Sequence, residues 1–384
     1  MRSVQARTAG AGHGSGAARF RGRGVGSTGM ASATGPDADG ERRNVSDAAG
    51  VAVLGSCAAW SLITAAMHDG RPEGVLLAVL AVAAGYASGR ISGALVPVAA
   101  PCVGAFAGLG MALAEPHLAP GPQFAVPLGH AGATATLLTL AVGSACCSAW
   151  ATSAPALRLA LRLLAAGITI AAAVLGSLSG FVLCTAVLLC SLAAGRMRHR
   201  GLGIAGLGLA TALVTGATWA VAGNVLPDGL TASLEGQLTP HRVQLWQDAL
   251  HMAHQDSALG VGPGRFGELS SAAAEALLPD GKPHSAPLQL AAEQGIVGVL
   301  LLAAAYCWVL HALWRTTRST PIALTAGAAL TGLAIVASVG NALSFTSVSV
   351  GAGFLAGLAT AHPIAEDASR IAPDAHARGD QLAP

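Results

Sequence analysis

Charged side chains are scarce in this chain, and their scarcity excludes an ordinary soluble domain. Only 10% of the 384 residues are charged and 4% are aromatic, whereas 53% are hydrophobic and the mean hydropathy is +0.59. Soluble globular domains carry about 25% charged residues. A bilayer core needs about 20 apolar residues for each helix that crosses it. The composition therefore predicts a membrane protein with several spans.

Metal and cofactor motifs are also missing. The seven cysteines all fall in apolar stretches without metal-ligand spacing, and they read as small buried apolar residues. His251 and His254 are three residues apart, but two histidines without further ligands are weak evidence for a metal. The sequence has no HExxH, no P-loop, no DxD-like pair and no nucleophile elbow. We therefore predict neither a metal nor a cofactor.

The hydrophobic residues gather in ten stretches. A continuous apolar stretch in a bilayer must be helical, because each backbone amide has to find its partner within the segment. The fold class is thus all-α, a polytopic transmembrane helix bundle of about ten helices. The stretches cover residues 48–67, 74–89, 92–114, 128–150, 156–176, 180–195, 202–222, 287–311, 321–339 and 342–361.

Ten crossings make a prediction about charge. If the N-terminus is cytoplasmic, inside connections and tails hold 17 of the 21 basic residues, and the outside holds Arg71, Arg242, Arg265 and Lys282. This distribution obeys the positive-inside rule. We expect a disordered basic cytoplasmic tail (1–46), seven helices (47–222), an extracytoplasmic loop (223–286), three helices (287–362) and a cytoplasmic tail (363–384). The basic N-terminal tail suits anionic lipid better than nucleic acid, so no nucleic-acid partner is predicted.

Ionisable groups concentrate in the large loop. Thr239-Pro240 suits a helix start, and the following residues place Val243, Trp246, Ala249, Leu250 and Ala253 on one apolar stripe. Such a short amphipathic helix would lie on the membrane surface or on the bundle, with Trp246 at interface depth. Arg242 lies one turn before Trp246. An arginine on a packed face is a candidate phosphate ligand, although an exposed one is usually only solvated.

The glycine-rich segment 260–267, GVGPGRFG, superficially matches a dinucleotide-binding fingerprint. No strand precedes it and Pro263 interrupts it, so we reject that interpretation. Its glycines, Gly262 and Gly264 among them, are expected to form a tight turn near substrate. Arg265 is either an additional phosphate contact or a solvated loop charge.

Two further ionisable residues flank the return to the membrane. His284 follows Lys282 at the mouth of the next apolar stretch, where it suits a general base or a phosphate donor, or else a structural role. Glu293 lies near the outer end of that stretch, a position that favours function but also allows a capping role.

Taken in order, these residues resemble the O-antigen ligase and polymerase superfamily. The shared pattern is R-x-x-x-W, G-x-G-x-x-F, H-[NS]-x-x-L and E-x-G-x-x-G, over about 60 residues. Here it reads Arg242 and Trp246, then Gly262, Gly264 and Phe266 (one residue tighter), then His284, Ser285 and Leu288, then Glu293, Gly295 and Gly298.

The resemblance implies a glycosyltransferase of the C-type class in the plasma (inner) membrane, without metal or nucleotide sugar. The donor would be a glycan on undecaprenyl diphosphate, a polyprenyl-diphosphate carrier, and a glycan or lipid would accept it in cell-surface polysaccharide assembly. Arg242 would hold the diphosphate and His284 would activate or orient the acceptor hydroxyl. Arg265, Lys282, Trp246, Gly262, Gly264 and Glu293 would complete the substrate site.

The chain departs from the family pattern in three places. Ser285 replaces the usual asparagine, ten helices replace the usual twelve, and Ser179-Gly180 stands where a Ser-Arg-Gly turn normally supplies an arginine. A catalytically inactive partner of an assembly complex therefore stays open, as does a transporter or flippase-like protein. Glycine pairs such as Gly104/Gly108 and Gly353/Gly357 favour close packing within the bundle over dimerisation.

Overall fold

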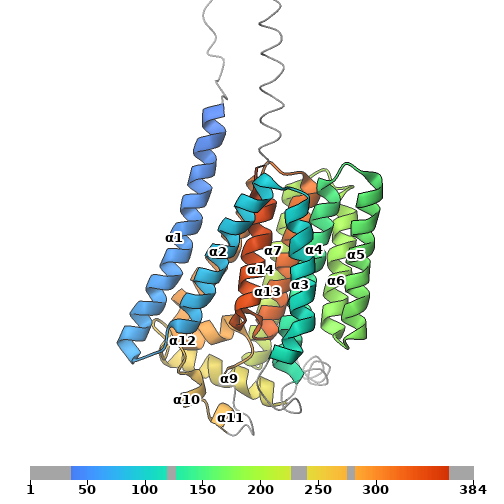
Figure 1. Ribbon diagram of the computed structural model, residues 1–384. Coiled ribbons are helices and arrows are strands. Elements are labelled where there is room, and N and C mark those ends of the chain that lie inside the picture. The colour runs from blue at the N-terminus through green and yellow to red at the C-terminus, as the bar shows by residue number, and fades with distance from the viewer. Residues whose placement is uncertain (1–35, 119–126, 226–239, 275–281, 363–384) are drawn as a thin grey trace, which may run out of the picture. The chain divides into compact units, whose positions relative to one another are not determined.

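The computed structural model describes residues 36–118, 127–225, 240–274 and 282–362, and side chains in most of these. The chain divides into two units, Met1–Arg43 and Asn44–Pro384. The described residues form helices joined by short connections, without any strand (Figure 1). The all-α prediction is confirmed.

Ten helices correspond one for one to the ten predicted stretches. Seven of them are long and apolar enough to cross a membrane, and the apolar parts of α3, α6 and α14 are shorter. The ten are α1 (Pro36–His68), α2 (Glu73–Leu95), α3 (Ala99–Leu118), α4 (Pro127–Ala151), α5 (Pro155–Val174), α6 (Leu178–Ala194), α7 (Arg200–Ala222), α12 (Ala286–Arg315), α13 (Thr320–Val339) and α14 (Thr346–Thr360).

Helix α1 begins earlier than predicted. It starts at Pro36, inside the segment 1–46 that we expected to be disordered, whereas residues 1–35 lie outside the described part. Proline is favoured at the first helical position, because its missing N–H would have had no partner there. For 36–46 the prediction of disorder is therefore wrong.

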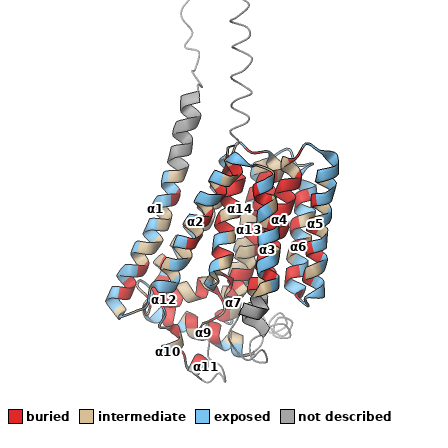
Figure 2. Cartoon of the chain, viewed as in Figure 1, coloured by how far each residue is buried: buried red, intermediate tan, exposed pale blue. Residues whose placement is uncertain are grey.

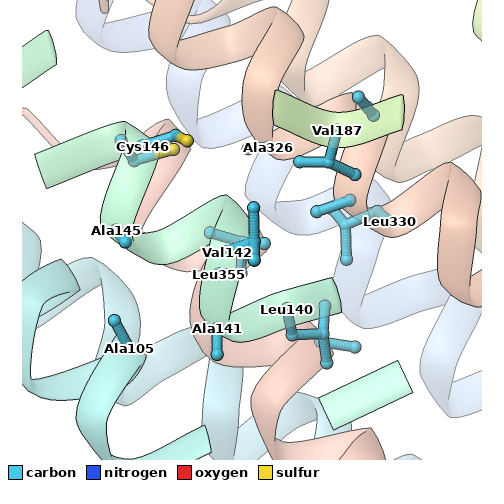
Figure 3. Close-up of a cluster of buried hydrophobic side chains, with 14 of the residues drawn as sticks. Ala105, Leu140, Ala141, Val142, Ala145, Cys146, Val187, Ala326, Leu330 and Leu355 are labelled. Carbon is cyan, nitrogen blue, oxygen red and sulfur yellow. The ribbon is translucent and has the colours of Figure 1, made fainter. Parts of the chain in front are cut away.

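The core of the bundle surrounds α4 and α13. In the most apolar part of each helix, 89% of the residues of α4 and 83% of those of α13 are buried. Figure 2 shows buried residues in red. Val142 and Leu140 of α4 pack with Leu330 of α13 and Leu355 of α14 (Figure 3). Most other spans bury only a narrow face and leave large apolar side chains on the outside, as a lipid-exposed surface requires.

Glycines bring α2 and α14 into close contact. A Cβ added at Gly89 would overlap the carbonyl oxygen of Phe354, and one added at Gly357 would overlap that of Tyr86. Gly104 and Gly108 of α3 lie against side chains of α14 and α4 in the same way. The predicted use of these small residues in close helix packing within the bundle is confirmed.

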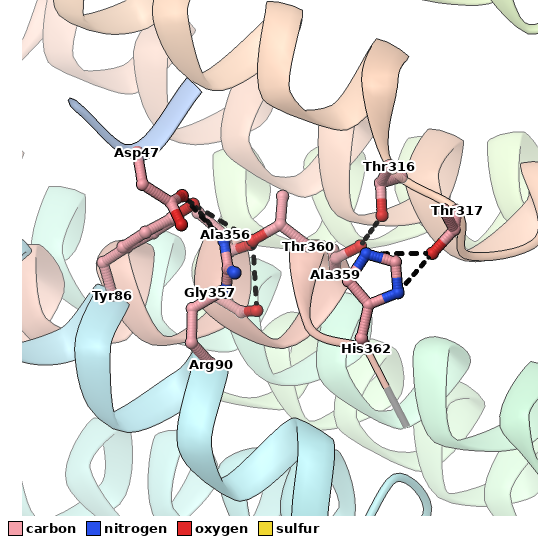
Figure 4. Close-up of polar contacts among 10 residues, drawn as sticks. All are labelled: Asp47, Tyr86, Arg90, Thr316, Thr317, Ala356, Gly357, Ala359, Thr360 and His362. Atoms are coloured by element: carbon pink, nitrogen blue, oxygen red, sulfur yellow. Dashed lines mark hydrogen bonds and ion pairs between the residues drawn. The ribbon is translucent and has the colours of Figure 1, made fainter. Parts of the chain in front are cut away.

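The end of the bundle remote from the large loop is held by polar contacts (Figure 4). Arg90 donates to Asp47 at 2.8 Å and also contacts the Tyr86 hydroxyl. The buried Arg318 donates to the carbonyl oxygens of Gly93 and Ala361, both at 2.8 Å. These oxygens lie at the C-terminal ends of α2 and α14, where a cation favours the helix dipole.

The opposite end carries the short helices of the large loop. These are α9 (Pro240–Gln255), α10 (Phe266–Leu269) and α11 (Ser271–Ala274), and they lie beside the turn between α1 and α2 and the start of α12 (Figure 1). The short 3-10 helix η1 (Ala342–Ser344) joins α13 to α14. Hydrogen bonds between residues far apart in the sequence tie the α1–α2 turn, the loop and α12 together.

Candidate functional site

Helix α12 is broken at Gly295. This glycine has φ 66° and ψ −166°, a backbone conformation that is essentially restricted to glycine. A Cβ there would overlap the carbonyl oxygen of Ala258. We predicted a continuous helix from 287 to 311, so the break is a finding of the structure.

The break frees backbone groups that distant residues then satisfy. The carbonyl oxygens of Ala292, Glu293 and Gln294 would normally accept bonds from the next turn of α12. Instead the N–H groups of Val261 and Gly262 donate to the first two at 2.8 and 2.9 Å, and the indole N–H of Trp60 donates to the third at 3.0 Å. The N–H of Ile296 donates to the carbonyl oxygen of Ser257 at 2.9 Å. The break is thus held by α1 and the loop.

Three glycines let the loop reach α12. Gly260, Gly262 and Gly264 have φ values of 68°, 97° and 75°, which side chains rarely tolerate. A Cβ on Gly260 would also lie 2.6 Å from the Ala292 carbonyl oxygen, the acceptor of the Val261 bond. The predicted tight turn is present, and its glycines allow close approach to the broken helix.

The Glu293 side chain fixes the same turn from inside. It is 2% exposed, and backbone N–H groups of Gly264 and Phe266 donate to its carboxylate. Gln289, one turn earlier, donates to it at 3.3 Å. The carboxylate therefore compensates for its burial by accepting several hydrogen bonds.

The turn between α1 and α2 joins the assembly from a distant part of the sequence. The N–H of Arg71 donates to the Pro263 carbonyl oxygen at 2.7 Å. Arg265 donates through Nη1 to the carbonyl oxygen of His68, at the end of α1, at 2.8 Å. Both arginines lie near the exposed Glu268, at 3.6 and 3.9 Å.

Helix α9 packs on the half of α12 that precedes the break. Trp246 is 1% exposed and shares a second hydrophobic core with Phe266, Leu288 and Ala292. The predicted stripe is correct at Trp246, Ala249 and Ala253 but misses Leu245 and Met252, which are also buried, while Val243 and Leu250 are half-buried. Trp246 thus lies in a protein core rather than at a surface. Arg242, one turn before it, is half-buried.

A cavity of about 380 Å³ opens beside these contacts, between α1, α2, the glycine turn, α12 and the α13–α14 connection. Its polar side chains come from the loop end of these elements and include Arg71, Lys282, Gln289, Glu293, Gln294 and Ser349. Its apolar wall continues along the helices through Leu54, Val79, Val82, Leu301, Leu302 and Ala305. The cavity is therefore amphipathic, with a charged mouth and an apolar interior.

Two polar atoms within this lining have no hydrogen-bond partner. They are Nε2 of Gln294 and Oγ of Ser349, on side chains that are at most 2% exposed. Gly298 leaves room for Gln294, because a Cβ at 298 would lie 2.6 Å from the Gln294 Cβ. The amide and the hydroxyl are therefore available to a polar group of a ligand in the cavity.

The structure gathers some of the predicted site residues and separates others. Lys282, Gly264 and Glu293 line the cavity, whereas Gly262 docks on α12. Arg242, Trp246, Arg265 and His284 are not part of the lining. His284 is half-buried and has φ 52°, unusual for a residue other than glycine, and it precedes the buried Ser285 at the start of α12.

Sequence reasoning missed Arg71, Gln289 and Gln294. Arg71 belongs to a short connection some 190 residues from the loop in sequence. The only sequence signal was its place among the four outside cations. No lining residue comes from α5 or α6, so the place where the family arginine is missing does not face this cavity.

The described residues hold no group of three or more His, Cys, Asp and Glu side chains suited to a metal ion. His251 pairs instead with Gln255 at 3.0 Å on the exposed side of α9. The chemistry that the described site offers is therefore that of cations, amides and one carboxylate at the edge of an apolar cavity.

Residues 132–303 match the sequence model of the O-antigen ligase family, a region that runs from α4 through the loop to the second half of α12. No curated protein and no solved structure matches the chain. The matched region contains α9, the glycine turn and the break in α12. It does not contain the α1–α2 hairpin or the α13–α14 connection, which also border the cavity. The chain has the apolar helices of a multi-pass membrane protein, and its residues 132–303, somewhat under half of its length, are similar to the O-antigen ligase family.

Proposed function

We propose that this protein transfers a glycan from an undecaprenyl-diphosphate carrier to an acceptor hydroxyl in cell-surface polysaccharide assembly. The amphipathic cavity is the observation that carries the proposal. A polyprenyl diphosphate has an anionic head and a long apolar tail, and the cavity has a mouth with Lys282 and an apolar wall along α1, α2 and α12. Apolar walls with a few placed polar groups are typical of ligand sites.

In the proposed reaction, the acceptor hydroxyl oxygen attacks the anomeric carbon of the donor glycan. The bond between that carbon and the diphosphate oxygen breaks, and its electron pair stays on the diphosphate. The hydroxyl proton passes to a base. Negative charge thus grows on the diphosphate as it leaves, so preorganised cations near it stabilise the transition state more than the ground state.

We assign Arg242 to the diphosphate and His284 to the acceptor hydroxyl. The assignment follows from the family pattern, and two observations support it. Arg242 and His284 each precede, by four residues, a member of the second core, Trp246 and Leu288. His284 also holds a costly backbone conformation between two buried residues, and such strain is common at functional sites. Trp246 then positions Arg242 by anchoring α9.

We place the loop and the cavity mouth outside the cytoplasm, with both termini inside. Arg71, Arg265 and Lys282 lie at the same end of the bundle as the loop, in agreement with the charge distribution along the sequence. The carrier would enter from the outer leaflet, where its glycan is exposed to acceptors.

The experiment is a transfer assay in membranes that hold a carrier-linked glycan pool, with wild type, Arg242→Ala and His284→Ala at equal expression. Loss of a preorganised charge contact lowers turnover about 10²–10³-fold, and loss of a general base lowers it about 10²–10⁴-fold. Arg198→Ala and His199→Ala provide matched controls, because both residues are exposed on the α6–α7 connection at the other end of the bundle.

Two other functions predict different outcomes. If wild type leaves a broad donor panel unconsumed, like empty membranes, an inactive partner of an assembly complex becomes the better explanation. A transporter of a polar cargo needs polar groups along its whole path. The cavity wall beyond Gln294 and Ser349 is apolar, which favours a lipid tail over a polar cargo.

A further inference from the structure

The described lining of the cavity includes two cations, and one of them comes from outside the matched family region. Lys282 belongs to the loop within residues 132–303, whereas Arg71 lies on the α1–α2 turn. We propose that Arg71 acts with Lys282 as a two-cation clamp for the diphosphate of the polyprenyl carrier. This inference rests on the proposed function and identifies a binding residue that the family pattern does not contain.

The backbone of Arg71 is held firmly at the mouth. Its N–H donates to Pro263 at 2.7 Å, and the preceding Gly70 packs so closely that a Cβ there would lie 2.8 Å from Pro263. Gly264 completes the fit, because a Cβ on Gly264 would lie 3.3 Å from the Cβ of Arg71. The glycine turn that docks on the broken helix therefore also fixes where Arg71 begins.

The guanidinium itself can rearrange. The Arg71 side chain is 76% exposed, and its ion pair with Glu268 is long, at 3.6 Å, with a partner that is 54% exposed. Exposed ion pairs of this kind contribute little stability. A phosphate oxygen offers charge-assisted and bidentate hydrogen bonds, which are stronger, so the side chain gains by exchanging Glu268 for the ligand.

Arg265 is less suited to this role. Its Nη1 already donates to the His68 carbonyl oxygen at 2.8 Å, and it is not part of the cavity lining. It holds the end of α1 against the loop, and so acts on the position of Arg71 through the turn between them.

Charge balance supports a diphosphate ligand. A diphosphate that links a lipid to a sugar carries one negative charge on each phosphate. Arg71 and Lys282 supply two positive charges, and the carboxyl group of Glu293, the described acidic side chain of the lining, interacts with Lys282 as well as with the N–H groups of Gly264 and Phe266, so a ligand would share Lys282 with it. The clamp thus supplies one cation for each phosphate when the donor binds, and the proposed contact with Arg242 acts on the charge that grows on the diphosphate as it leaves.

The test is binding of farnesyl diphosphate and farnesyl monophosphate to the purified full-length protein in nanodiscs. We expect wild type to bind the diphosphate, and Arg71→Gln to weaken that binding by about tenfold or more while changing monophosphate binding by about twofold or less. Arg71→Lys keeps the positive charge but loses the bidentate guanidinium, so its affinity for the diphosphate should lie between those of wild type and Arg71→Gln. Glu268→Gln removes the competing partner and should bind the diphosphate at least as well as wild type.

Each other result has a distinct meaning. If Arg71→Gln binds both probes as wild type does, or weakens both equally, the clamp is overturned while the proposed function stands. Failure of wild type to bind either probe would overturn the lipid-diphosphate donor itself. If Arg71→Gln does not fold, the other two variants still test the clamp. The clamp requires Arg71→Lys to bind the diphosphate more weakly than wild type and Glu268→Gln to bind it at least as well as wild type.

Discussion

Helices α12 and α13 follow each other in the chain and are comparably apolar, but they serve different purposes. Helix α13 is unbroken and buried over 83% of its apolar window, without a charged residue. Helix α12 is buried over only 28% and is broken at Gly295, with Gln289, Glu293 and Gln294 in the half before the break. One helix is a scaffold at the centre of the bundle, and the other lines the candidate site at its edge.

The difference lies in where each helix finds its hydrogen-bond partners. Helix α13 satisfies its own backbone, as a helix in a bilayer normally does. Helix α12 depends on Trp60, Val261 and Gly262 for the carbonyl oxygens beside its break. The conformation of the site is therefore shared among α1, the loop and α12, and a change in any one of them should reach the cavity.

The same substitution in the two helices gives the largest expected contrast. Gly295→Ala forces a side chain into a conformation that costs about 1–3 kcal/mol and into overlap with the Ala258 carbonyl oxygen. We expect a lower thermal unfolding midpoint and transfer reduced at least about tenfold.

Gly327→Ala in α13 is the matched control. Its Cβ would meet the end of the flexible Leu207 side chain at 2.9 Å, and alanine favours the helix by about 1 kcal/mol. We expect little net change in the unfolding midpoint. Equal effects of the two substitutions would end the distinction between scaffold and site.

A smaller effect is expected from Glu293→Ala. The substitution leaves the N–H groups of Gly264 and Phe266 without their acceptor, and hydrogen bonds of this kind contribute about 0.5–1.5 kcal/mol each. The glycine turn should detach from α12, which limited proteolysis of the loop would detect as faster cleavage. Glu268→Gln, at an exposed position of the same loop, should be cleaved like wild type.

The smallest effect concerns Trp60. Trp60→Phe keeps an aromatic ring but removes the N–H that donates to Gln294, a loss of about 0.5–1.5 kcal/mol. The unfolding midpoint should fall slightly. Trp314→Phe, on the exposed far end of α12, should leave the midpoint unchanged. An equal fall in both variants would show that the hydrogen bond from Trp60 to the Gln294 carbonyl oxygen contributes nothing to stability.

Much of the fold was predictable from the sequence because each span carries its own signal. Ten apolar stretches gave ten helices, and the glycine pairs gave their close crossings. The break in α12 was not predictable, since Gly295 stands in an otherwise helical pattern. The residues that hydrogen-bond to the backbone groups beside the break, such as Trp60, lie far away in the sequence. For the same reason Arg71 was assigned to one side of the membrane but not to the site.

The predicted loop residues show the same limit. The glycines of the loop were correctly assigned to a tight turn, because their residue type alone indicates positive φ. Which cation faces the cavity depends instead on tertiary contacts. Lys282 and Arg265 looked equivalent in the sequence, yet one lines the cavity and the other holds the end of α1.

The position of Lys282 also makes the protein convenient for chemical labelling. It is the single lysine among 21 basic residues, so an amine-selective reagent has one side-chain target, at the mouth of the cavity. A ligand bound there would shield it. The extent of labelling at one residue, read by mass spectrometry, would then report occupancy of the cavity in native membranes without any engineered handle.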